Sequence, residues 1–108
     1  MTTKTILNNL VKQLEKGESH NIASVKLFGS RAREDHSRDS DIDVIIVTKR
    51  NHHKIENLVR DYVVGLLIKN GAYLSIKIYD KKKYDLLSRK RTFFIQHLEK
   101  DSIELWKV

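Results

Sequence analysis

Residues 28–47 read FGSRAREDHSRDSDIDVIIV, and this stretch carries most of the functional information in the chain. Gly29 and Ser30 follow an apolar segment, and a Gly-Ser turn between a strand and a short helix offers backbone N–H groups to an anion. After ten further residues, Asp41 and Asp43 open a second apolar run. Alternate positions of a strand point to the same face, so both carboxylates lie on one side. Together these residues suit a nucleoside triphosphate bound with a divalent metal.

The composition is that of one small globular domain over residues 1–108, with 40% hydrophobic and 32% charged residues. A chain of this length buries roughly 60 to 70% of its unfolded surface, which is enough for one modest core. No apolar stretch approaches the roughly 20 residues that span a bilayer, and the N-terminus has no signal-peptide core. We therefore expect a cytoplasmic protein with no membrane contact. Cysteine is absent, which excludes disulfides, thiolate metal sites and a cysteine nucleophile.

Hydrophobic spacing predicts alternating helices and strands. Apolar residues at helical spacing predict two amphipathic helices, one that stops near Gly17 and a longer one closed by Asn70 and Gly71. A continuous β-branched run predicts a central strand buried on both faces. The predicted helices cover residues 6–14, 55–67, 82–89 and 92–100, with a loop and short helix at 30–40; the predicted strands cover 22–28, 42–47, 74–79 and, at an edge, 103–106. The fold class is therefore α/β (α+β), a small mixed sheet flanked by helices.

The net charge of +7 is concentrated in one part of the chain. Between Lys77 and Arg91 the sequence carries seven Lys or Arg against two Asp. Such a run is either a solvated face or a patch that contacts phosphate, and the sequence leaves both open. Nucleic acid, an acidic protein or a polyphosphate would each suit this charge.

Residues 27–33, LFGSRAR, and 40–44, SDIDV, resemble the nucleotidyltransferases of the DNA polymerase β superfamily. The family hallmark is an apolar residue, Gly-Ser, a spacer of about ten residues and then Asp-x-Asp. The short chain and the Arg-Ala-Arg step are most similar to the minimal nucleotidyltransferases. The resemblance implies the polymerase β-like nucleotidyltransferase fold. It also implies transfer of a nucleoside monophosphate from a triphosphate to a hydroxyl, with pyrophosphate leaving.

The resemblance also implies roles for the residues of the turn. Gly29 would let the backbone approach the phosphates, and Ser30 would hydrogen-bond them. Arg31 and Arg33 would neutralise the triphosphate, although two Arg on a short exposed helix are often merely solvated.

Asp41 and Asp43 would be the catalytic metal ligands, holding Mg²⁺ or Mn²⁺. Active members of the family usually carry a third carboxylate on a later strand. Here the polar face of that strand presents Ser75 and Lys77, and strand alternation puts Asp80 on the opposite face. Lys77 would either compete with metal or contact phosphate. The sequence therefore leaves open a one-metal site, a group borrowed from a partner, or a catalytically inactive protein.

Minimal nucleotidyltransferases are often antitoxins of HEPN ribonuclease toxins, and some attach AMP to a tyrosine of the toxin. By this resemblance we expect ATP as substrate and a HEPN-domain protein as partner and acceptor. Three alternatives remain: a regulatory subunit that binds nucleotide without catalysis, a nucleotidyltransferase acting on nucleic acid or a small molecule, and a ribonuclease. The third is disfavoured because HEPN folds are entirely helical. Clustered apolar residues near the C-terminus leave a homodimer possible.

Overall fold

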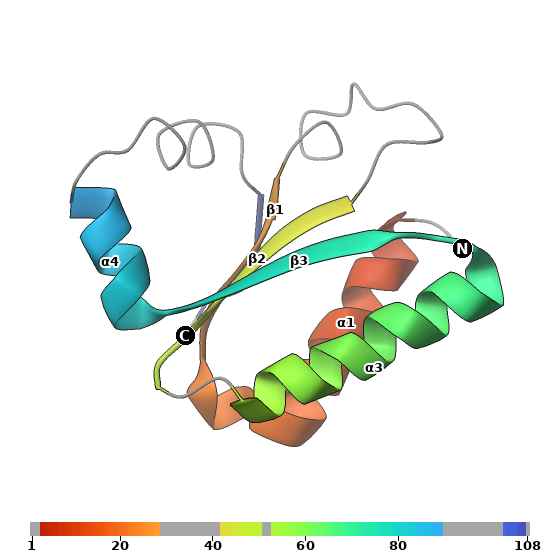
Figure 1. The fold of residues 1–108 in the computed structure, drawn as a ribbon, viewed down its shortest axis with the longest axis horizontal. Helices are drawn as coiled ribbons and strands as arrows, with labels where there is room; N and C mark the ends of the chain where they lie inside the picture. Colours follow the sequence, from red (N-terminus) through yellow and green to blue (C-terminus); the bar gives the residue numbers. More distant parts are fainter. Residues whose placement is uncertain (1–2, 29–41, 51–52, 90–102, 108) are drawn as a thin grey trace.

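A computed structural model describes residues 3–28, 42–50, 53–89 and 103–107. The elements follow the predicted alternation of helices and strands, and each predicted strand is confirmed (Figure 1). The predicted helices at 30–40 and 92–100 lie outside the described residues. In chain order the elements are α1 (Thr3–Glu18), the 3-10 turn η1 (Ser19–Asn21), β1 (Ile22–Phe28), β2 (Ile42–Thr48), α3 (His53–Asn70), β3 (Leu74–Asp80), α4 (Lys81–Arg89) and β4 (Ile103–Lys107).

The strands form one mixed sheet in the order β3-β2-β1-β4. β1 runs antiparallel to both β2 and β4, whereas β2 and β3 are parallel and are joined through α3. β2 is an interior strand and β4 an edge strand, as the apolar run and the C-terminal pattern predict. The mixed sheet with its flanking helices confirms the predicted fold class.

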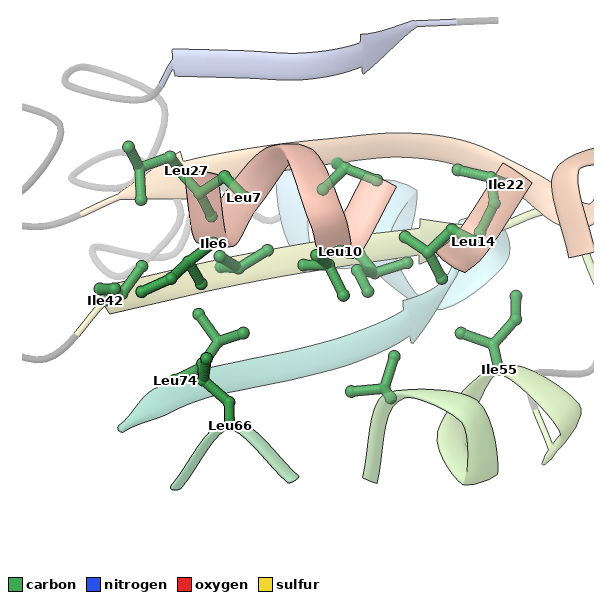
Figure 2. Close-up of a cluster of buried hydrophobic side chains, with 14 residues drawn as sticks. Ile6, Leu7, Leu10, Leu14, Ile22, Leu27, Ile42, Ile55, Leu66 and Leu74 are labelled. Carbon is green, nitrogen blue, oxygen red and sulfur yellow. The ribbon is translucent and has the colours of Figure 1, made fainter. Parts of the chain in front are cut away.

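The main core lies between the sheet and the layer formed by α1 and α3 (Figure 2). Leu10 and Leu14 of α1 are fully buried and project toward the sheet, while Ile55 and Leu66 of α3 project toward the same strands. The alternate residues of β2 that face this layer are Ile42, Val44 and Ile46. Burying such side chains is the main favourable term in folding a small domain.

A second, smaller apolar cluster lies on the opposite face of the sheet. It joins Phe28 of β1 and Ile45 and Val47 of β2 to Tyr84 of α4. β2 is therefore buried on both faces along most of its length, which explains its continuous β-branched sequence. α4 contacts β2 and β3, so it covers part of this second face.

Two glycines lie at or near the ends of α3 and α1, and they have different roles. Gly71 adopts a left-handed backbone conformation with φ 67°. Its N–H donates to the carbonyl of Leu67 at 2.9 Å, which is the usual glycine end of a helix. Gly17 does not stop α1 as predicted, because the helix continues to Glu18. A Cβ at Gly17 would lie 2.6 Å from Cδ1 of Leu58, so this glycine permits the close approach of α1 and α3.

In the described part of the chain, no helix is both long enough and apolar enough to cross a membrane.

Candidate active site on the second face of the sheet

Asp43 lies on the face of the sheet opposite α1 and α3. Its neighbours in β2, Ile42 and Val44, point into the main core, so alternation turns the Asp43 carboxylate to the second face. The side chain is half-buried. In the ladder Asp43 stands between Phe28 of β1 and Ser75 of β3, and these three residues form one row across the sheet.

The next row across the same face carries two lysines. Ile45 is paired with Lys26 on β1 and with Lys77 on β3. Strands next but one in a sheet are about 10 Å apart, and successive rows on one face are separated by roughly 7 Å. Both ammonium groups therefore belong to side chains that start one row from Asp43. Lys26 was missed in the sequence, although its alternation with Val25 and Leu27 would have placed it on this face.

Aromatic side chains of β3 and α4 lie at the far end of this face. The rings of Tyr79 and Tyr84 have centroids 6.3 Å apart. Lys26 Nζ lies 5.9 Å from the centre of the Tyr84 ring, and Lys83 Nζ lies 5.9 Å from that of Tyr79. These distances allow cation–π contacts. The face thus runs from a carboxylate at one end, through two lysines, to a basic helix at the other.

Asp80 does not stand beside Asp43. The register pairs it with Thr48 at the other end of β2, and it continues the alternation that the sequence predicts. Its Oδ1 accepts a hydrogen bond of 2.7 Å from the backbone N–H of Lys83. Asp80 is therefore the N-terminal cap of α4, a role in which a short acidic side chain satisfies an unpaired helix N–H. In the ladder the place next to Asp43 belongs to Ser75, and Lys77 lies one row further on.

Five of the predicted site residues lie outside the described residues: Gly29, Ser30, Arg31, Arg33 and Asp41. The structure does show where their segment begins and ends. β1 finishes at Phe28 and β2 starts at Ile42, and the two strands are antiparallel neighbours with Phe28 opposite Asp43. The two halves of the motif therefore enter the sheet at the same end, next to the Asp43 row.

The donor set on this face suits a hard metal ion only in part. Asp43 offers a carboxylate and Ser75 a hydroxyl, both oxygen donors of the kind that Mg²⁺ and Mn²⁺ accept. Among the described residues no three His, Asp or Glu side chains are grouped as a metal site. Asp43 is thus a fitting ligand that needs further oxygen donors, which the segment before β2 and a bound phosphate could supply.

The sequence matches the nucleotidyltransferase domain family over residues 6–105. No curated protein matches the chain in sequence. Solved structures of similar fold include a candidate nucleotidyltransferase from Sulfolobus solfataricus, which is 21% identical. Its TM-score is 0.61, and the match covers 95% of this chain and 78% of that one.

Two other similar structures contain a bound nucleotide or a protein modified with AMP. Spectinomycin adenyltransferase AAD(9) from Enterococcus faecialis, solved with ATP and spectinomycin, has a TM-score of 0.77 at 14% identity; the match covers 98% of this chain and 56% of that one. The complex of tri-AMPylated Shewanella oneidensis HEPN toxin with MNT antitoxin gives a TM-score of 0.57 at 15% identity, covering 99% of this chain and 74% of that one.

The fold, a mixed sheet with an acidic residue at the start of its second strand, is that of a nucleotidyltransferase. The chain belongs to the nucleotidyltransferase domain family, a family of enzymes.

Proposed function

We propose that this protein transfers AMP from ATP to a hydroxyl group of a protein, a tyrosine of a HEPN ribonuclease toxin, and thereby acts as its antitoxin. The observation that carries the transfer step is Asp43, a carboxylate at the start of an interior strand on the face that α1 and α3 leave open. The family match supports the reaction class. The acceptor is proposed by analogy with one protein of similar fold, an MNT antitoxin in complex with an AMPylated HEPN toxin.

The predicted site residues would have different roles, according to their positions in the chain. Gly29 and Ser30 would bind the phosphates through backbone N–H groups and a hydroxyl at the end of β1. Asp41 and Asp43 would hold Mg²⁺ or Mn²⁺, which supplies Lewis-acid stabilisation of the charge on the phosphates. Arg31 and Arg33 would neutralise the triphosphate next to the turn.

The two lysines in the row next to Asp43 support the proposal that the ligand is a polyanion. Lys26 and Lys77 flank Ile45 on the face that carries Asp43. Positive side chains near a binding site raise the local concentration of an anion and stabilise charge that develops during transfer. They would help to hold the phosphates or the acceptor beside Asp43.

The test uses ATP labelled at the α-phosphate, Mg²⁺ and lysate of the source organism. We expect the wild-type protein to label a macromolecule, and Asp43→Asn to lose most of that labelling. Asp61→Asn is the matched control, since Asp61 is exposed on α3, away from the site. Equal labelling by wild type and Asp43→Asn would refute the proposed role of Asp43. The mass of the labelled product identifies the acceptor and tests the HEPN assignment separately.

One observation favours a second candidate, a regulatory nucleotide-binding subunit without catalysis. Ser75, a hydroxyl and not a carboxylate, stands next to Asp43 in the ladder. Calorimetry with ATP and Mg²⁺ distinguishes the two functions. Binding that depends on Asp43, together with no transfer of label to any component of the lysate, would establish the regulatory role.

A further inference from the structure

The outer edge of β3 forms one end of the sheet. β2 pairs with one edge of β3, and within the described residues no strand pairs with its other edge. An edge of this kind presents a row of backbone N–H and C=O groups that can pair with a strand of another chain. Figure 1 shows β3 lying beside α3 at this end, and the two elements are in contact.

A groove of about 410 Å³ runs between α3 and β3 along this end of the sheet. Its lining includes Val64 of α3 and Tyr73, which precedes β3, and its polar lining includes Glu56 and Arg60. Val64 is 50% exposed and Tyr73 53%, and Ile68 on the same helix is 77% exposed. An exposed apolar surface with a polar rim is typical of a protein interaction site.

We infer that a second copy of this chain covers this surface. The two β3 strands pair antiparallel at their free edges, about a two-fold axis near Ile76. The two sheets then join into one, with both α3 helices on the same side. In such a symmetric contact each surface must be complementary to itself.

The side chains of β3 meet that condition when the axis lies at Ile76. An axis at Lys77 would set the two Lys77 ammonium groups directly opposite each other, and opposed like charges destabilise a strand pair. An axis at Ile76 removes this repulsion. Aromatic and apolar residues then oppose one another, which stabilises the pairing. The opposed residues are Ser75 with Lys77, Leu74 with Ile78, and Tyr73 with Tyr79.

The strand edge and the helix flank supply a large part of the area that a specific dimer buries. The seven residues of β3 extend over roughly 23 Å, and α3, with 18 residues, over about 27 Å. With a layer spacing of about 10 Å, the strand edge and the helix flank present roughly 500 Å² in projection, and more when the relief of side chains is included. Specific interfaces bury about 800 Å² per partner, which is about a ninth of this chain's 7223 Å².

The pairing reaches the row that contains Asp43. Ser75 lies next to Asp43 in the ladder, and in the dimer each Ser75 faces Lys77 of the other copy. Each site would thus gain a lysine from the second chain at its outer side. The dimer itself does not depend on the proposed reaction, so a failure of either proposal leaves the other intact.

The first test is the mass of the protein in solution. We expect light scattering at tens of micromolar protein to give twice the chain mass of 12.7 kDa. Val64→Arg places two charges at the contact and should yield a monomer with an unchanged circular dichroism spectrum. Leu86→Arg is the matched control, because Leu86 is 49% exposed on α4, away from this surface, and it should remain a dimer. A monomeric wild type, or a dimer unaffected by Val64→Arg, overturns the inference.

The second test fixes the register with single cysteines, which is possible because the chain has none of its own. Ile76→Cys would face its twin with Cα atoms about 5 Å apart, within disulfide range. Ile78→Cys is the control, since its twin would be offset by roughly 13 Å along the strands. We expect mild oxidation to cross-link Ile76→Cys and not Ile78→Cys. Cross-linking of Ile78→Cys alone, or of neither, overturns the proposed pairing.

Discussion

Ser75 occupies the ladder position next to Asp43, where a carboxylate would add a further oxygen ligand or a base to the proposed site. The ladder sets its side chain next to Asp43, on the strand where active members of the family usually carry a third carboxylate. We predict that Ser75→Asp raises the rate of AMP transfer on the order of tenfold or more, because a positioned general base contributes roughly 10²–10⁴-fold. The rate of label transfer from ATP measures the effect, with Ser75→Asn as the uncharged control.

Lys77→Asp provides the matched comparison for that experiment. Lys77 faces Ile45 and not Asp43, so a carboxylate at this position lies one row away. Because this change also removes a lysine proposed to hold the phosphates, it should lower transfer and not raise it. A gain from Lys77→Asp would show that the acceptor lies beside the row that contains Lys77.

Tyr62 links α3 to α1, and we expect its hydroxyl to make the free energy of unfolding vary with pH in the alkaline range. Its hydroxyl donates a hydrogen bond of 2.8 Å to the carbonyl of Ile6. Burial raises the pKa of Tyr62 above its usual value of 10.0. The unfolded chain therefore loses this proton first, so the stability from the neutral hydroxyl is complete below pH 10 and is lost as the pH rises through the folded-state pKa.

We predict that Tyr62→Phe lowers the free energy of unfolding at pH 7 by about 0.5–1.5 kcal/mol, the usual net value of one hydrogen bond. Above pH 10 the difference between variant and wild type should shrink. Urea unfolding at pH 7, 9.5 and 10.5 measures both effects. A difference that grows with pH would contradict the assignment.

Among the secondary-structure elements, the junction of β3 and α4 gives Asp80 a structural role, distinct from the metal-binding role proposed for Asp43. Asp80 ends β3 and caps α4 through the N–H of Lys83. We predict that Asp80→Ala costs about 0.5–2 kcal/mol of stability, as loss of an N-cap does. Transfer activity per folded molecule should be unchanged, because Asp80 pairs with Thr48 at the far end of β2 from Asp43.

Thermal unfolding and labelling assays on the same preparation test the two halves of this prediction. Asp80→Asn should recover most of the stability, since Asn is also a good cap. An Asp80→Asn variant that is stable but inactive would make Asp80 part of the site, contrary to the register.

In the molecule as a whole, one face of the sheet carries the larger apolar cluster, and the other carries a smaller cluster together with the proposed site. α1 and α3 bury the larger cluster, whereas Asp43, Lys26 and Lys77 lie on the other face. A chain of 108 residues has only a modest core. Substitutions in the larger cluster should therefore act on stability before they act on the site.

We predict that Leu10→Ala lowers the free energy of unfolding by about 2–5 kcal/mol, because Leu10 is fully buried between α1 and the sheet. Chemical denaturation followed by circular dichroism measures the loss. Leu86→Ala, at an exposed position on α4, should change stability by no more than about 0.5 kcal/mol. Similar losses for the two variants would contradict this division of the core.

The alternation of helices and strands, and with it the fold class, could be read from the sequence alone. The reason is that hydrophobic periodicity records which side of each element is buried: the continuous run of β2 marks burial on both faces, and the spacing in α3 marks one apolar stripe. The same periodicity placed Asp43 away from the core and Asp80 on the opposite face from Ser75. The family resemblance supplied the reaction class, which the match over residues 6–105 supports.

Which residues become neighbours across strands could be learned only from the folded structure. Lys26 lies 51 residues before Lys77 in the chain, yet β-sheet pairing sets both beside Ile45. The structure also decided that Asp80 caps a helix and that Gly17 admits Leu58 instead of ending α1. Strand order and register arise from contacts between distant segments, and a local pattern of hydrophobicity carries no information about which strand lies next to which.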